Sequence, residues 1–215
     1  MKKILVALLL LTLLVGCGNG TTSVTKTGEF QTEETAYILA ENFDMINVSL
    51  KSMSDDFYSR YLRLPSVQPV LRNIAIFKQH AHVEIITPIV QEISYVELNE
   101  MTDFLYAIDK NIPWHIFRLY RTHERQDEKG RDFGETISFI EKTKNRLPYT
   151  YFGNFPGSRW EDTYCSACQN RVIRRISIGA CGAQYLEDSL TDDDRCPICN
   201  NPIPIVRSVN RAETK

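Results

Sequence analysis

Two Cys-x-x-Cys pairs near the carboxyl terminus constrain this chain more than any other feature. They are Cys165-Ser-Ala-Cys168 and Cys196-Pro-Ile-Cys199, and 27 residues separate them. Two thiolates in one tight turn can bind a metal ion from the same side, and a second pair completes the tetrahedral sulfur shell that Zn²⁺ prefers in structural sites. We therefore expect a structural zinc ion; disulfides, reduced thiols and a redox dithiol are the alternatives. A shell of four sulfurs leaves no open coordination position, so such a site serves folding rather than catalysis.

The amino-terminal residues have the pattern of an export signal. Two lysines precede an apolar run over residues 4–15, which is shorter than the roughly 20 residues that span a bilayer. Residues 14–17, Leu-Val-Gly-Cys, resemble the lipobox of bacterial lipoproteins. We expect residues 1–16 to be a signal peptide and Cys17 to be the lipidated first residue of an exported, membrane-anchored lipoprotein. An uncleaved anchor, or a misassigned start codon with a cytoplasmic product, is the alternative.

The charge balance gives no indication of a nucleic-acid partner, and the cysteine count leaves one cysteine without an assigned role. The 215 residues include 25 basic and 27 acidic side chains, which give a formal net charge of −2. No basic stripe indicates a nucleic-acid partner. Beyond Cys17 and the two pairs, one cysteine is left over, Cys181, which is either buried or a competing metal ligand.

Strand and helix signals alternate between residue 24 and residue 157. Short apolar or β-branched runs predict strands, and one-sided apolar spacing behind a capping residue predicts the helices between them. At one helix start, Ser94 and Glu97 predict a capping box. The expected strands are residues 24–26, 45–50, 82–87, 114–120 and 149–152, with helices beginning near residues 32, 54, 66, 94 and 134.

This alternation predicts an α/β fold with a parallel sheet. About five βα units are too few to close an eight-stranded barrel, so we expect a partial (half) TIM-like barrel followed by a small zinc-ribbon-like module. The expected domains are the signal peptide over residues 1–16, the tether and partial barrel over residues 17–157, and the four-cysteine, zinc-ribbon-like module over residues 158–215.

Motifs at several places carry a resemblance to a known enzyme family. They include Pro-Trp-His at residues 113–115 and Gly-Asn-Phe-Pro-Gly at residues 153–157. In order and spacing the motifs resemble the radical S-adenosylmethionine (SAM) enzymes. More narrowly, they are similar to the carboxyl-terminal half of the pyruvate formate-lyase-activating-enzyme-like branch of the AmmeMemoRadiSam system. The other matching segments are residues 44–51, 54–58 and 163–168.

The resemblance has consequences for cofactors. It implies that Lys51 and His115 line a pocket for S-adenosylmethionine. Members of the family also bind a [4Fe–4S] cluster, through a Cys-x-x-x-Cys-x-x-Cys loop in their amino-terminal half. This chain has no cysteine between Cys17 and Cys165, and it has Ser-Leu-Lys at residues 49–51 where the family has Asp-x-Lys. We therefore expect no cluster on this chain and no radical catalysis by the chain alone. A solvated lysine and a core histidine are the alternative roles for Lys51 and His115.

The remaining histidines, His80, His82 and His123, match no metal-binding or catalytic spacing and are expected at the surface. Arg118 lies three residues beyond His115, so strand alternation places the two side chains on opposite faces and predicts that they do not cooperate.

Three functions fit this sequence. The first is a truncated radical-SAM-like lipoprotein with a structural metal ribbon, a non-catalytic binding or docking module. The second is the cluster-less half of a split radical SAM enzyme, whose partner chain supplies the missing half-barrel. The third is a truncated gene product that folds poorly. A reduced iron–sulfur cluster suits an exported, oxidising location poorly, which favours the first function over the second.

Overall fold

The computed structural model of the protein describes residues 24–27, 31–90, 93–118, 132–155, 157, 159–177 and 183–207. The predicted signal peptide, Cys17, Cys181 and His123 lie outside these residues. Within the described part of the chain, no helix is long and apolar enough to cross a membrane.

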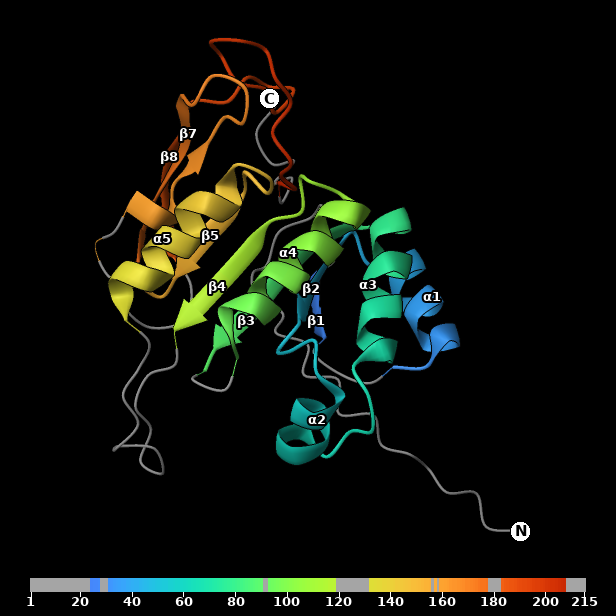
Figure 1. Ribbon diagram of the computed structural model, residues 1–215. Coiled ribbons are helices and arrows are strands. Elements are labelled where there is room, and N and C mark those ends of the chain that lie inside the picture. The colour runs from blue at the N-terminus through green and yellow to red at the C-terminus, as the bar shows by residue number, and fades with distance from the viewer. Residues whose placement is uncertain are drawn as a thin grey trace.

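A parallel β-sheet forms the larger part of the molecule (Figure 1). It has five strands whose order follows the chain, so that each strand pairs in parallel with the next one. The prediction of an α/β fold with a parallel sheet is therefore confirmed. The strands are β1 (Val24–Thr27), β2 (Met45–Ser49), β3 (His82–Ile89), β4 (Trp114–Arg118) and β5 (Thr150–Gly153).

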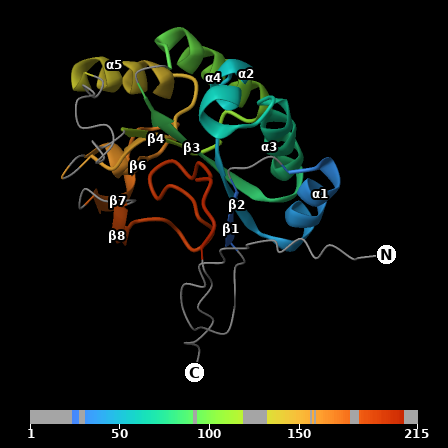
Figure 2. The same ribbon diagram turned by 90° about the horizontal axis from the view of Figure 1, so that it is seen from below.

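Helices connect the strands and cover the outer face of this sheet. Figure 2 shows α1, α3, α4 and α5 along the outside of the curved sheet, with the carboxyl-terminal segments on its opposite side. The predicted caps are present, because the Thr32, Ser54 and Ser94 side chains each accept a hydrogen bond from the backbone N–H three residues later. The helices are α1 (Glu33–Asn42), α2 (Asp55–Phe57) with the π-helical turn η1 (Tyr58–Leu62), α3 (Gln68–His80), α4 (Tyr95–Ile108) and α5 (Phe133–Lys144).

The sheet face toward the helices is apolar and closely packed. Alternate strand residues point to this side, and Ile46, Ile85 and Ile116 on three successive strands are fully buried there. Trp114 is the largest fully buried side chain, and its polar group is satisfied: Nε1 donates to Thr87 Oγ1 at 2.9 Å, and that hydroxyl donates to the Leu50 carbonyl at 2.8 Å. This chain of hydrogen bonds ties β4 to β3 and to the end of β2.

The capping box predicted at α4 is only half correct. Ser94 Oγ accepts from the Glu97 N–H at 3.1 Å as expected. Glu97 Oε1, however, accepts hydrogen bonds from the Ser52 hydroxyl and from the Met53 N–H, the latter at 2.7 Å. The carboxylate thereby holds the loop after β2 against the start of α4 and supplies the acceptor for its Met53 N–H.

A three-stranded antiparallel sheet and two cysteine-containing turns form the carboxyl-terminal module. The module has its own hydrophobic core, which includes Tyr149 and Tyr151, whereas Phe152 belongs to the core under the helices. Strand β5 therefore serves both cores with its alternate faces. The module comprises the 3₁₀ helix η2 (Arg159–Glu161), β6 (Thr163–Tyr164), β7 (Arg171–Ser177) and β8 (Ala183–Asp188).

Gly153, at the end of β5, is required by a close approach. It pairs with Phe117, and a Cβ atom built on Gly153 would lie 1.8 Å from the Phe117 ring. Any other residue here would displace that aromatic side chain.

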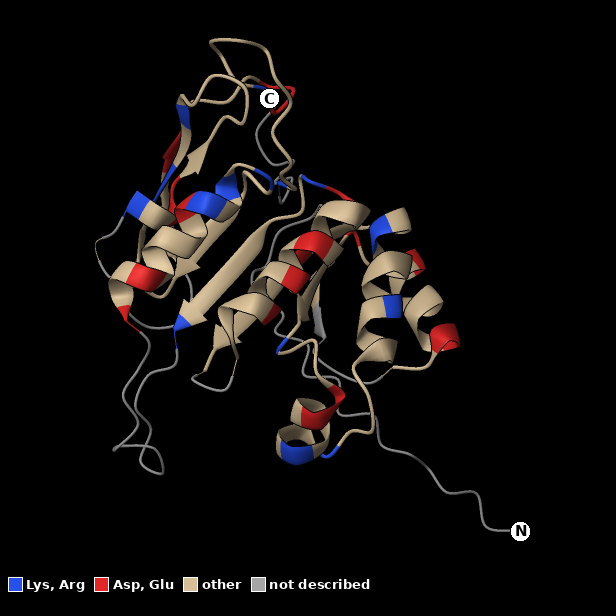
Figure 3. Cartoon of the chain, viewed as in Figure 1, with Lys and Arg blue, Asp and Glu red and all other residues tan. Residues whose placement is uncertain are grey.

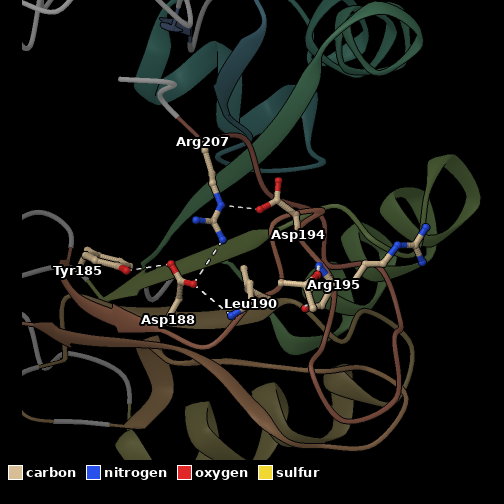
Figure 4. A network of polar contacts seen from close by, with 7 residues as sticks. Tyr185, Asp188, Leu190, Asp194, Arg195 and Arg207 are labelled. Atoms are coloured by element: carbon tan, nitrogen blue, oxygen red, sulfur yellow. Dashed lines mark hydrogen bonds and ion pairs between the residues drawn. The ribbon is translucent and has the colours of Figure 1, made fainter. Parts of the chain in front are cut away.

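Arg207 fastens the last described residues to the module (Figure 4). Its guanidinium contacts Asp194 at 2.5 Å and Asp188 at 3.3 Å. Asp188 is held in turn by the Tyr185 hydroxyl at 2.8 Å and by the Leu190 N–H at 3.1 Å. Elsewhere, Figure 3 shows both basic and acidic residues among the helices, with only acidic ones along α4.

Candidate metal centre and polar cavity

The structure brings together the cysteines of both pairs. The sulfur atoms of Cys165, Cys168, Cys196 and Cys199 all lie within 4.8 Å of one another. Cys165 Sγ is 3.5 Å from Cys199 Sγ, and Cys168 Sγ is 3.6 Å from Cys196 Sγ. These distances exceed the S–S bond length of about 2.05 Å, so disulfides are absent from this cluster. They match the separation of about 3.8 Å between sulfurs that each lie about 2.3 Å from a tetrahedral zinc ion.

The two cysteine turns have the same backbone geometry. Cys165 N–H donates to the Asn170 carbonyl at 2.8 Å, and Cys196 N–H donates to the Asn201 carbonyl at 2.9 Å. The residue after each second cysteine is left-handed, with φ of 60° at both Gln169 and Asn200. Asn tolerates this conformation well, whereas Gln adopts it less readily. The two turns share one strained conformation, and their sulfur atoms lie close together. This arrangement indicates a site for one ligand shared by both turns.

The acid–base properties of the thiols fit a cation at their centre. Although burial raises the pKa of the Cys196 thiol, hydrogen bonds from the Cys199 and Ile198 backbone N–H groups lower it to about 6. The Asn201 backbone lowers the pKa of Cys199, but the neighbouring thiols, Cys168 first, raise it to about 12. The cluster stabilises one thiolate and resists further ones, because like charges at this spacing repel. A divalent cation would remove that repulsion, so the four side chains fit a bound metal ion.

A second polar cluster lies on the inner face of the parallel sheet, opposite the helices. Asn47, Glu84 and His115 occupy inward positions on β2, β3 and β4, where Asn47 is in register with Glu84. Glu84 lies between two imidazoles: its Oε1 is 3.4 Å from His82 Nε2, and its Oε2 is 3.2 Å from His115 Nε2. Burial alone would raise the pKa of Glu84, but hydrogen bonds and charge from His115 and His82 hold it well below its usual range. The surface position predicted for His82 is therefore wrong, because its side chain is only 15% exposed and pairs with this carboxylate.

The carboxyl-terminal module adds more polar groups to this cluster. The His115 ring stacks on Tyr151, with centroids 5.0 Å apart and an interplanar angle of 20°. Burial raises the pKa of Tyr151 to about 12, and its hydroxyl is 3.0 Å from Thr163 Oγ1. Arg175 Nη1 donates to the same Thr163 hydroxyl at 2.7 Å and to the Glu161 carbonyl at 3.1 Å.

Together these groups line a cavity of about 270 Å³ between the inner sheet face and the module. Its walls are Asn47, Glu84, Ile86, His115, Phe117, Glu161, Arg175 and Ala183. Charged and hydrogen-bonding side chains that converge on one cavity are typical of a ligand site rather than of a hydrophobic core.

The two residues assigned to S-adenosylmethionine have different surroundings. His115 lies in the wall of the cavity and contacts Glu84 and Tyr151. Lys51 follows the end of β2, is half-buried, and is not part of the cavity wall; its backbone N–H is 3.4 Å from the Tyr58 hydroxyl. Arg118 points away from His115, with its guanidinium over the Phe133 and Phe155 rings at 5.0 and 5.8 Å. The predicted independence of Arg118 and His115 is thus confirmed.

Sequence reasoning missed four polar residues of the cavity: Asn47, Glu84, Glu161 and Arg175. A signal was present for the first two, because Asn47 and Glu84 are polar residues at alternate positions of otherwise apolar strands. Glu161 and Arg175 carried no such signal, since their position depends on how the module packs against the sheet.

Comparisons with known proteins support the fold. No protein-family model matches the chain. The chain is 28% identical over 177 residues to an uncharacterized protein of Methanocaldococcus jannaschii; the match covers 76% of this chain and 49% of that protein. The chain therefore spans about half the length of this curated relative.

A solved structure shows the same fold. It is a domain of the pyruvate-formate lyase-activating enzyme from Bacteroides vulgatus, similar with a TM-score of 0.51 and 16% sequence identity. The match covers 60% of this chain and 80% of that domain. At this identity the likeness concerns the fold alone, and the chain shares the α/β architecture of that activating-enzyme domain. The narrower resemblance to the AmmeMemoRadiSam branch and to its carboxyl-terminal half stays a prediction.

Proposed function

We propose that this chain is a radical-SAM-like protein of the non-catalytic kind: a partial TIM-like barrel closed by a structural zinc ribbon. The observation that carries the proposal is the pair of matching cysteine turns with four sulfurs within 4.8 Å. Such a shell is closed, so its ion would hold the module together and would offer no position to a substrate. Cys165, Cys168, Cys196 and Cys199 would be the ligands.

The number and position of the cysteines argue against radical chemistry by this chain. Cluster-binding loops of the radical SAM type need three thiolates, and the only cysteines outside the four-sulfur site are Cys17 and Cys181. His115 already contacts Glu84 and Tyr151, and Lys51 is not part of the cavity wall. At most a remnant of an S-adenosylmethionine site would therefore be present around Lys51 and His115.

We propose that the protein lies on the outer side of a membrane and is anchored through lipid on Cys17, because residues 14–17 resemble a lipobox.

A second candidate function is the cluster-less half of a split enzyme. The observation that favours it is the position of β1 at the edge of the parallel sheet, where a partner chain with the missing half-barrel would add its strands. Co-expression with a partner that carries Cys-x-x-x-Cys-x-x-Cys would then give a stable complex containing a cluster.

Metal analysis tests the first function. Purified protein should contain about one zinc per chain and show no iron–sulfur absorbance. Chelation should unfold the module, because metal binding and folding are coupled in such sites. Cys196→Ser should lose the metal, whereas the matched variant Cys181→Ser should retain it.

A different metal would contradict this proposal. Stoichiometric iron and a brown colour would assign a cluster to these thiols. Loss of zinc in Cys181→Ser would show that the ligand set is not the four-sulfur site.

A further inference from the structure

The inner-face cavity contains acceptors that the protein itself leaves unused. Three polar atoms of the described cavity wall are buried without a hydrogen-bond partner: Glu161 Oε1, Asn47 Oδ1 and His115 Nε2. His115 Nε2 lies 3.2 Å from Glu84 Oε2 and forms an ion pair with it, so the two oxygens are the atoms without any polar contact. Glu161 as a whole is only 4% exposed. Both oxygens belong to residues of the same cavity wall, although one comes from β2 and the other from η2.

Unpaired buried acceptors are unusual. More than about nine in ten buried polar groups have a partner, and each exception calls for an explanation. Two such acceptors in one cavity, contributed by segments 114 residues apart, are explained together if a hydrogen-bond donor occupies the space between them.

The charges around the cavity define that donor. Glu84 and Glu161 supply two carboxylates, and Arg175 supplies the one permanent cation of the cavity wall. Arg175 uses Nη1 on Thr163 and on the Glu161 carbonyl rather than on the Glu161 carboxylate. His115 is engaged with Glu84 at 3.2 Å. The carboxylate of Glu161 therefore has no ion-pair partner among the described residues, and burial raises its pKa, with His115 and Arg175 offsetting part of the effect.

We infer that this cavity binds a small organic cation, a primary ammonium or guanidinium group, which donates N–H hydrogen bonds to Glu161 and Asn47. A cation would pair with the Glu161 carboxylate, and its several N–H groups suit acceptors that approach from two sides. The cavity of about 270 Å³ lies at the lower limit for ligand sites of about 300–1,000 Å³, so the ligand is smaller than a typical drug molecule. The aliphatic part of such a ligand would lie against Ile86 and Phe117, the apolar residues of the same wall.

Calorimetry on the full-length protein tests this inference with four probes of similar size. The cations n-butylammonium and n-butylguanidinium are compared with the neutral n-butanol and the anion butyrate, all at one ionic strength. We expect saturable binding of at least one cation and no saturable binding of butanol or butyrate. Glu161→Gln should weaken that binding by at least about tenfold, because it removes the charge that assists the hydrogen bond.

A matched variant controls for surface charge. Glu187→Gln removes a carboxylate whose side chain is 63% exposed and which pairs with Arg174 outside this cavity, so it should leave cation binding unchanged within about twofold. Butyrate binding as tightly as butylammonium, or equal cation affinity in Glu161→Gln and wild type, would overturn the inference. Binding of S-adenosylmethionine alone, with no response to either simple cation, would overturn it too.

Discussion

A substitution at Glu161 would measure how much the polar cavity lowers the free energy of unfolding of this protein. Glu161 is 4% exposed, and one of its carboxyl oxygens has no hydrogen-bond partner within the described residues. The Asn154 backbone and the Ser177 side chain hydrogen-bond to the carboxyl group, but they do not cancel the effect of burial, and its pKa stays raised. The charged form is therefore less favourable in the folded protein than in the unfolded chain.

The sign of the pH dependence follows from that shift. A glutamate in an unfolded chain has a pKa of about 4.3, and below this value both states carry the proton and stability is not penalised. As the pH rises from the unfolded to the folded pKa, the unfolded chain loses its proton before the folded protein does, and the free energy of unfolding falls. The penalty therefore grows over this window and is complete above the folded pKa.

We predict that Glu161→Gln is more stable than the wild type at neutral pH and equally stable near pH 3. An unsatisfied buried polar group costs about 1–3 kcal/mol. Gln keeps an oxygen for Asn154 and Ser177 but places an amide N–H₂ on the other side, so we expect a net gain of about 1 kcal/mol. For a protein of this size the gain corresponds to a rise in Tm of about 2–4 °C.

Thermal unfolding followed by circular dichroism, measured at half-unit steps from about pH 3 to pH 8, provides the test. Glu187→Gln is the control and should change stability by less than about 0.5 kcal/mol at every pH, because its side chain is 63% exposed. A Glu161→Gln variant that is less stable at pH 7, or a difference that does not vary with pH, would show that the carboxylate is satisfied in the folded protein. The reasoning for a polar cavity in need of a donor would then fail.

Three further predictions concern other parts of the chain. Cys17→Ala should abolish palmitate labelling and release the protein from the membrane fraction, whereas a wild-type protein found soluble with Met1 retained would refute export. The chain alone should form no 5′-deoxyadenosine from S-adenosylmethionine under strong reductant, and tight binding of that molecule that is lost in a Lys51→Ala, His115→Ala double variant would contradict a remnant site. Arg207→Ala should make residues 203–207 more accessible to a broad-specificity protease and lower stability by about 1 kcal/mol or less, since its ion pairs are partly exposed. Arg174→Ala is the control and should leave this segment protected.

Local sequence signals were sufficient for the elements and for the metal centre. Strands such as β3 are recognisable because a parallel sheet under helices needs apolar residues along its length. The cysteines of each pair are separated by only two residues, so one turn already brings them together. The pairing of the two turns was a simple inference, since a tetrahedral ion needs both.

Contacts between segments distant in the sequence could not be predicted from local sequence signals. Glu97 fits a capping box by spacing, yet its carboxylate serves Ser52 and Met53, which lie more than 40 residues earlier. The cavity depends on the register that places Asn47 beside Glu84, and on a module that brings Glu161 and Arg175 to the same side. Register and docking are set by the sum of many packing contacts, which no single motif encodes.

The metal centre and the cavity are joined by strand β5. Tyr149 Oη donates to Ser166 in the first cysteine turn at 3.3 Å, and Tyr151, two residues later on the same face, bonds to Thr163 and stacks on His115. Thr163 also anchors Arg175 at 2.7 Å. An ion bound by the four sulfurs would therefore hold in place the turn that orients the module's half of the cavity wall. Such an ion would influence whether the cavity forms, although it has no open coordination position.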